Sequence, residues 1–296
     1  MSDTTPTLPP PRREPVFNLP GVVVACIAVL VALYALYSFA SDATQDWAIA
    51  TFAFVPARLA IALGLAQDQL RDAVQELPQD TFTMLIGSGS ARWWTLLTYA
   101  LMHGSWAHVG FNCLWLAVFG APVARRFGAP RFLLLLALAA IAGALVQFLA
   151  AMASFVPVVG ASAAIAGAMG AATRFVFRPS GEASPLFRAE QLDAAFRLPA
   201  LSLSEMVRTR AALLFIVFWF VTNLLFGLFP NLTGVSDGPI AWPAHIGGFL
   251  TGLFAFPLLD PRRPPTELEP EVSADVPMSE QGIPGDGSAA EPRPPF

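Results

Sequence analysis

Long apolar runs separated by short polar stretches set the pattern of this chain. Five of them approach the roughly 20 apolar residues that a helix needs to cross a bilayer. They cover about residues 20–40, 106–123, 132–152, 211–229 and 242–259. A shorter sixth run begins near Ser162 and meets Arg174. The pattern predicts an all-α, polytopic membrane protein in which residues 20–260 form a bundle of six transmembrane helices.

The segment between the first two predicted spans, residues 41–92, fits neither a span nor an ordinary loop. Residues 48–66 are apolar, but Pro56 and Arg58 interrupt them. A stretch this short and broken is a poor candidate for a crossing helix. We therefore expect this first loop to be interfacial or re-entrant.

Polar tails flank the predicted membrane domain. Residues 1–19 are polar and proline-rich, and residues 261–296 are dominated by Pro, Glu, Gly and Ser. A segment of the second kind buries too little apolar surface to offset the entropy of ordering, so we expect the C-terminal tail to be disordered.

The composition fits a protein whose main partner is the lipid bilayer. Of its 296 residues, 55% are hydrophobic and only 13% are charged. All 17 basic residues are arginines and alanine is abundant, which is typical of GC-rich coding and indicates a bacterial inner-membrane protein. Both cysteines, Cys26 and Cys113, lie in apolar runs, which argues against a disulfide framework or a cysteine metal site. The pattern predicts no nucleic-acid partner and no cofactor, and it leaves the oligomeric state open.

The arginines are distributed unevenly across the six predicted spans. One side carries Arg12, Arg13, Arg125, Arg126, Arg131, the six arginines of residues 174–210, Arg262 and Arg263. The other side carries Arg58, Arg71 and Arg92, all in the long first loop, where the positive-inside rule is weakest. The rule therefore predicts that both termini are cytoplasmic.

Candidate chemistry gathers near the outer ends of the predicted spans. The three histidines, His103, His108 and His245, all lie near an outer boundary. His108 and Asn112 are four residues apart, so they share a face of the second span. Ser162 opens the fourth span and His245 lies near the start of the sixth, and both spans run inward. A candidate nucleophile and a candidate base therefore lie toward the same side of the membrane.

Small residues on two of these helices would allow the nucleophile and the base to meet. Residues at four-residue steps after Ser162 are Ala and Gly, and Gly248 and Gly252 follow His245 on the sixth span. Faces of this kind let helix backbones approach closely. Docking them would bring the Ser162 hydroxyl within reach of the His245 imidazole.

Each of these residues also has a purely structural explanation. A single serine in a span commonly bonds its own helix, and a boundary histidine can anchor to headgroups. His245 is harder to explain in this way, because ionisable groups inside spans are costly and usually functional. A histidine metal site is disfavoured, because no carboxylate lies in spans two, four or six to complete or orient it.

Three separated motifs, in order and in register, resemble the rhomboid family of intramembrane serine proteases. They run from about residue 90 to 255. The matching residues are Trp94 with Thr98, Ala100-Leu101-Met102-His103, His108 with Phe111-Asn112, Gly160-Ala161-Ser162 with Gly167, and Ala244-His245-Ile246-Gly247-Gly248 with Gly252.

The resemblance implies catalysis by a Ser–His dyad without a third acid. Ser162 would be the nucleophile and His245 the base. His108, Asn112 and the backbone N–H of Ser162 would form the oxyanion hole. His103 would have a supporting, hydrogen-bonding role, and Phe111 would lie beside the path of the substrate. Gly160, Gly248 and Gly252 would support the site, and the substrates would be transmembrane proteins cleaved in or beside their spans.

The chain departs from the family pattern at three positions. The glycine that usually follows the nucleophile is Ala163 here. The position of an aromatic that often stacks on the catalytic histidine is Ala166, so another ring, Trp242 or Phe249, would have to orient His245. The common Trp-Arg pair reads Trp94-Thr95, which predicts a different anchor for the first loop. None of the departures removes a proposed catalytic group.

The leading hypothesis is thus an active intramembrane serine endopeptidase. The alternative is a catalytically inactive protein of the same fold that binds membrane clients, although such relatives typically lack the serine or the histidine. A transporter or channel is a weaker hypothesis, because it would be expected to carry acids or paired charges within its spans.

The arginine distribution makes a direct prediction of topology. Reporters of cytoplasmic location fused after Arg263 or inserted near Glu190 should be active, because both positions lie on the arginine-rich side. A reporter inserted at Asp237 should face outward. A reversal at any of these three positions would show that a span has been miscounted.

Overall fold

The computed structural model describes residues 19–87, 89–178, 199–229 and 241–261. Both predicted tails, apart from Leu19 and the first residue of the C-terminal tail, lie outside the described residues, as do most of the arginine-rich connection and the loop containing Asp237.

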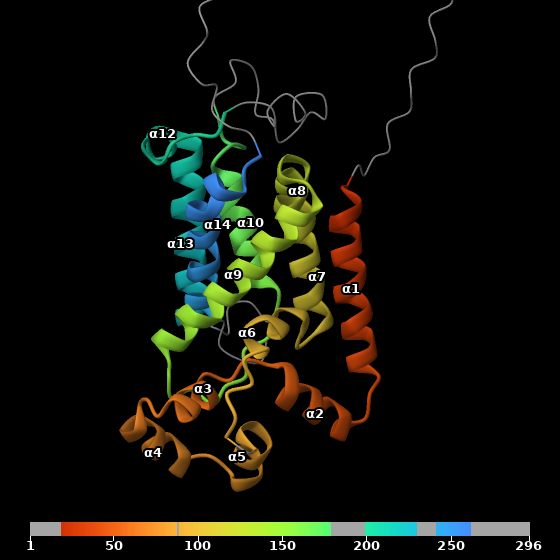
Figure 1. Cartoon of the computed structure of the whole chain (residues 1–296), viewed down its shortest axis with the longest axis vertical. Coiled ribbons are helices and arrows are strands. Elements are labelled where there is room, and N and C mark those ends of the chain that lie inside the picture. The colour runs from red at the N-terminus through yellow and green to blue at the C-terminus, as the bar shows by residue number, and fades with distance from the viewer. Residues whose placement is uncertain (1–18, 88, 179–198, 230–240, 262–296) are drawn as a thin grey trace, which may run out of the picture. The chain divides into compact units, whose positions relative to one another are not determined.

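Helices dominate the described part of the chain (Figure 1). The long ones are α1 (Gly21–Ser38), α7 (Trp106–Trp115) with its continuations η2 (Leu116–Gly120) and α8 (Ala121–Phe127), α9 (Ala129–Ala150), α10 (Ser162–Thr173), α13 (Arg210–Leu228) and α14 (Trp242–Leu259). The shorter ones are α2 (Asp42–Phe52), α3 (Pro56–Leu63), α4 (Gln67–Gln75), α5 (Gln79–Ile86), α6 (Thr95–Thr98), η1 (Tyr99–Leu101) and α12 (Leu203–Arg208).

The predicted class, a polytopic helical membrane protein, is confirmed. Five helical stretches of the described residues are long and apolar enough to cross a membrane. The fourth predicted span is α10, whose 12 residues extend about 18 Å at 1.5 Å per residue. That is shorter than a hydrocarbon layer of about 30 Å, so the count of six spans stays a prediction.

The predicted span ends differ from the helix ends by a few residues. The third predicted span is α9, which begins at Ala129, ahead of the predicted Phe132, and therefore contains Arg131. Pro130 favours this early start, because a proline in the first turn removes an N–H that would have no helical partner. The second span runs through η2, where the helix widens to π geometry. Pro122 explains the widening, because it lacks an N–H and its ring crowds the carbonyl four residues earlier.

Helix α10 is the centre of the bundle, and its composition is the reason. Every residue from Ala163 to Thr173 is buried, and most are Ala or Gly. The backbone of α14 lies directly against it: a Cβ added at Gly252 would lie 1.8 Å from the Gly167 carbonyl oxygen, and one at Gly248 would lie 2.0 Å from that of Ala163. Only glycine permits this approach, so the small residues set how closely α10 and α14 dock.

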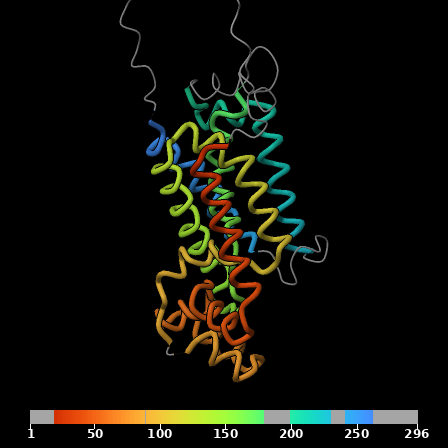
Figure 2. The backbone as a smooth tube through the Cα atoms, turned by 90° about the vertical axis from the view of Figure 1, so that its right-hand side faces the viewer, coloured from red at the N-terminus to blue at the C-terminus, as the bar shows by residue number. Residues whose placement is uncertain are grey.

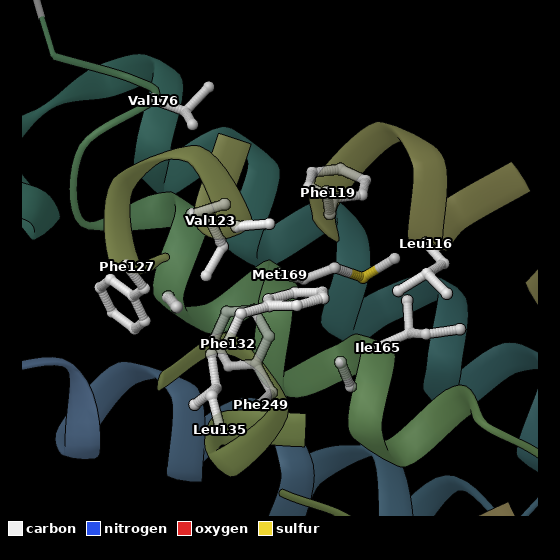
Figure 3. Close-up of a cluster of buried hydrophobic side chains, with 14 of the residues drawn as sticks. Leu116, Phe119, Val123, Phe127, Phe132, Leu135, Ile165, Met169, Val176 and Phe249 are labelled. Carbon is white, nitrogen blue, oxygen red and sulfur yellow. The ribbon is translucent and has the colours of Figure 1, made fainter. Parts of the chain in front are cut away.

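Larger side chains fill the space on the other side of α10. Met169 and Ile165 of α10 lie in a buried cluster with Leu116 and Phe119 of η2 and Phe132 of α9 (Figure 3). The interdigitation of small and large residues gives α10 close neighbours on all sides, which is what makes it a rigid platform for its first residue, Ser162.

A charged cluster closes the bundle at the end of α14. Arg126 of α8 binds Asp260 through two hydrogen bonds, Nε to Oδ1 at 3.1 Å and Nη2 to Oδ2 at 2.6 Å. The Arg126 guanidinium also lies over the rings of Phe175 and Phe256. A buried pair of this kind is stable when bidentate geometry and further contacts offset its desolvation. It ties the ends of α8, α10 and α14 together.

The first loop folds into the short helices α2 to α5, which lie together at one end of the long helices (Figure 2). None exceeds 11 residues, so none is long enough to cross a bilayer alone. The loop is anchored by donors to backbone carbonyls: Arg58 Nε bonds the Leu85 oxygen at 2.7 Å, and Trp94 Nε1 bonds the Thr51 oxygen at 2.9 Å. These bonds hold the first loop in place in a chain that has Trp94-Thr95 instead of the Trp-Arg pair.

The close docking of α10 and α14 predicts a large difference between two glycine substitutions. Gly252→Ala should lower the melting temperature in detergent, because the new methyl group forces two backbones apart, and overpacking of this kind costs about 1–3 kcal/mol. Gly110→Ala in α7 is the matched control, because a Cβ there meets no atom within 4 Å. Alanine at that position should leave the melting temperature unchanged or raise it. Equal melting temperatures for the two variants would contradict the docking.

Candidate active site

Two polar side chains from the docked helices face each other at the end of the bundle nearer the first loop. Ser162 is the first residue of α10 and His245 is in the first turn of α14. The Ser162 Oγ lies 2.7 Å from the His245 Nε2, which is hydrogen-bonding distance. Both residues are only partly buried, whereas every later residue of α10 is buried. The close backbone approach at Gly248 and Gly252 thus sets the separation of these two side chains.

The turn before Ser162 is held in a conformation that requires glycine. Gly160 has a φ of +120°, a region that residues with a Cβ rarely adopt. Its N–H donates to the Tyr99 carbonyl at 3.0 Å, and the Tyr99 hydroxyl donates to the Ala140 carbonyl at 2.8 Å. A pair of backbone bonds between Phe54 and Val158 fixes the same stretch of chain to the first loop. The turn that precedes Ser162 is therefore hydrogen-bonded both to η1, through Tyr99, and to the first loop, through Phe54.

The first turn of α10 leaves backbone donors available beside the serine. The first hydrogen bond of this helix runs from the Ile165 N–H to the Ala161 carbonyl at 2.9 Å. The N–H groups of Ser162, Ala163 and Ala164 precede it and have no partner within the helix. Donors of this kind at a helix start favour negative charge, which is the charge of an oxyanion.

His108 and Asn112 converge on the same turn from α7. A Cβ built on Gly160 would lie 2.7 Å from His108 Nε2 and 3.7 Å from Asn112 Nδ2. Both side chains therefore lie over the backbone two residues before Ser162. Ser105 fixes the start of α7 by accepting a hydrogen bond from the His108 N–H at 3.1 Å, which is a typical helix N-cap. A side chain at position 160 would displace the His108 ring.

The structure places the two remaining residues of the predicted site around this group. His103 is buried and lies edge-on to His108, with ring centroids 5.0 Å apart. Neither of its ring nitrogens makes a hydrogen bond of standard geometry with a described residue, and its hydrogen-bonding role stays a prediction. Phe111 lies on the neighbouring part of α7 with 49% of its surface exposed.

One residue of the site was not predicted from the sequence. The His245 Nδ1 lies 2.6 Å from the Oδ1 of Asn223, on α13. The two rings proposed for orienting the histidine pack on other groups: Phe249 stacks on Trp219 at a centroid distance of 4.5 Å, and Trp242 packs against Gly227. The signal that could have found Asn223 is its polarity, because an amide in an otherwise apolar span is costly unless it has a partner.

The described residues contain no group of three or more His, Cys, Asp or Glu side chains placed to hold a metal ion. The arrangement instead combines a hydroxyl, an imidazole bonded to it, and several N–H donors close to the hydroxyl. Chemically, such a group can activate the hydroxyl as a nucleophile and stabilise the negative charge of an addition intermediate.

Comparison with known proteins agrees with this arrangement. A family model described as the Rhomboid domain matches residues 90–261, which is more than half of the chain. The chain is 42% identical over 87 residues to "Rhomboid protease GluP" and 34% identical over 85 residues to "Putative rhomboid protease YdcA", both from Bacillus subtilis (strain 168).

Each match covers 29% of this chain, but only 16% of the first relative and 42% of the second. The chain is therefore similar to these proteins over much less than two thirds of their length, and the family assignment rests on the domain. Because that domain spans all the residues of the site and most of the helical bundle, the chain belongs to the rhomboid family of integral membrane proteins.

Proposed function

We propose that this protein is an intramembrane serine endopeptidase that uses a Ser162–His245 dyad. Membership of the rhomboid family supports intramembrane proteolysis as the general class of activity. The observation that carries the specific assignment is the 2.7 Å distance between Ser162 Oγ and His245 Nε2. This is the hydrogen bond that a nucleophile and its general base need before reaction.

The dyad accounts for both halves of peptide-bond hydrolysis. As Ser162 Oγ bonds to the scissile carbonyl carbon, its proton passes to His245 Nε2. The imidazolium then gives that proton to the leaving amine as the C–N bond breaks, and the acyl group stays on Ser162. A water molecule, deprotonated by the same imidazole, hydrolyses the ester and restores the serine hydroxyl.

Negative charge on the carbonyl oxygen would be stabilised by donors from α7 and α10. Asn112 Nδ2 and His108 Nε2 lie over the turn at Gly160, close in sequence to the Ser162 N–H. His108 would be a donor there in its Nε2–H tautomer. Preorganised donors of this kind stabilise the transition state because they require no reorganisation as the charge develops.

The proposed substrates are transmembrane segments of other proteins, cleaved in or next to the bilayer. The bacterial relatives support a bacterial plasma membrane as the location. The arginine distribution supports cytoplasmic termini, with the dyad toward the outer face.

Single substitutions of the dyad should each abolish cleavage of a labelled single-span substrate by purified protein. The double variant Ser162→Ala/His245→Ala should be no less active than either single variant, because the two side chains act as a unit. Ser38→Ala is the control, since that hydroxyl bonds only its own helix at Ala35 and lies on α1. Wild-type turnover in Ser162→Ala would reject the dyad, and an inactive wild type across a broad substrate panel would favour the inactive, client-binding alternative.

Asn112 distinguishes an oxyanion role from a structural one. If Asn112 acts only on the transition state, Asn112→Ala should lower kcat with little change in KM. Loss of one such donor typically lowers the rate about 10²–10³-fold. A smaller loss here is also consistent with the oxyanion role, because His108 and the Ser162 N–H remain as donors. The melting temperature and the single-turnover rate should be measured on one preparation. A large loss of stability with a normal rate per folded molecule would contradict the oxyanion role.

A further inference from the structure

The histidine of the site is held by an amide on α13, and the amide itself has a fixed orientation. Asn223 Nδ2 donates to the Trp219 carbonyl, one turn earlier on the same helix, at 2.9 Å. This bond requires the nitrogen of the amide to face the helix and its oxygen to face outward. The outward Oδ1 is the atom that lies 2.6 Å from His245 Nδ1.

The direction of these bonds fixes the tautomer of His245. A carbonyl oxygen can only accept, so Nδ1 must carry the hydrogen that joins it to Asn223 Oδ1. In a neutral imidazole the other nitrogen, Nε2, then has a free lone pair. That lone pair is aimed at Ser162 Oγ at 2.7 Å, and so accepts the serine proton. One chain of hydrogen bonds therefore runs from the Trp219 carbonyl through Asn223 and His245 to the nucleophile.

The same region explains how Asn223 is brought to the histidine. Trp219 stacks on Phe249 of α14 with centroids 4.5 Å apart, and Phe220 meets the same ring edge-on at 5.6 Å. Phe249 lies four residues after His245 and therefore on the same side of α14. Apart from such contacts α13 is peripheral, with Ala212 its only buried residue. The contacts of Trp219 and Phe220 with Phe249 thus dock α13 on α14 in a position from which Asn223 reaches His245.

We infer that Asn223 is a positioning residue that holds His245 in the Nδ1–H tautomer and in the orientation required of the base, so that the site works as a Ser–His–Asn triad. The inference rests on the proposed function for its kinetic consequence. Ala166, where the family resemblance predicts a ring that stacks on the imidazole, offers only a methyl group. A hydrogen bond from α13 takes the place of that ring.

The tautomer can be measured without any substrate. In protein labelled with ¹⁵N-histidine, three residues give ring signals, and the His245→Ala spectrum identifies those of position 245. At a pH high enough for the His245 imidazole to be neutral, wild-type protein should show a protonated Nδ1 and an unprotonated Nε2 at His245. In Asn223→Leu, which has nearly the same shape but no acceptor, the signals should move toward the Nε2–H form or to an exchange average. An unchanged spectrum in Asn223→Leu would overturn the inference.

Thr222 provides a matched control on the same helix. Its hydroxyl bonds the Phe218 carbonyl at 2.7 Å, just as Asn223 bonds the carbonyl four residues before it. Thr222→Ala therefore removes an equivalent bond within α13 but none to His245. It should leave both the His245 spectrum and the turnover unchanged. If Thr222→Ala altered them as much as Asn223→Leu does, the role of Asn223 would be general support of α13.

Kinetics then test the consequence for catalysis. Asn223→Leu should lower kcat by at least about 10-fold with little change in KM, and by no more than the roughly 10²–10⁴-fold that a general base contributes as a whole. Asn223→Asp should restore most of the rate, because a carboxyl group accepts from Nδ1–H whether it is ionised or protonated. Equal kcat for wild type and Asn223→Leu would reject the positioning role. If the wild type cleaves nothing, the proposed protease activity fails, while the tautomer measurement still decides whether Asn223 positions His245.

Discussion

The contact between the α10 and α14 backbones is the constraint on which the site depends. Gly248 and Gly252 lie so close to the carbonyls of Ala163 and Gly167 that no side chain fits between the helices. Two rigid helices at a fixed separation hold their first turns at a fixed separation as well. This is how a site built from two side chains distant in sequence can keep a 2.7 Å hydrogen bond between two helices that dock through small apolar residues.

The helical membrane class could be predicted from the sequence because a bilayer leaves few alternatives. Backbone groups in lipid must be bonded internally, so long apolar runs become helices. The shorter apolar run from Ser162 to Arg174 also predicted the bounds of α10, but not that every residue after Ser162 would be buried. The run continues the apolar pattern of the preceding loop, and Gly160 with its positive φ ends the irregular backbone just before Ser162. A helix surrounded by protein also needs no lipid-facing length, which hydropathy alone does not reveal.

The site shows the same division between what sequence patterns specify and what they do not. Spacing along one helix relates His108 to Asn112, and helix direction relates the depth of Ser162 to that of His245. Neither argument specifies which helix lies beside another laterally. Asn223 belongs to the peripheral helix α13, and its contact with His245 depends on the docking of Trp219 on Phe249. A missing ring at position 166 indicated that something else orients the base, but not which residue does so.

The central claim is that His245 activates Ser162 as a nucleophile, and covalent labelling tests it most directly. Purified protein in detergent would be treated with a fluorophosphonate, which reacts with activated serines, and the site of the adduct located by peptide mass spectrometry. The account predicts a single adduct on Ser162 that is lost in folded His245→Ala protein. Failure of Ser162 to react in folded wild-type protein, or equal labelling of Ser162 without His245, would contradict it.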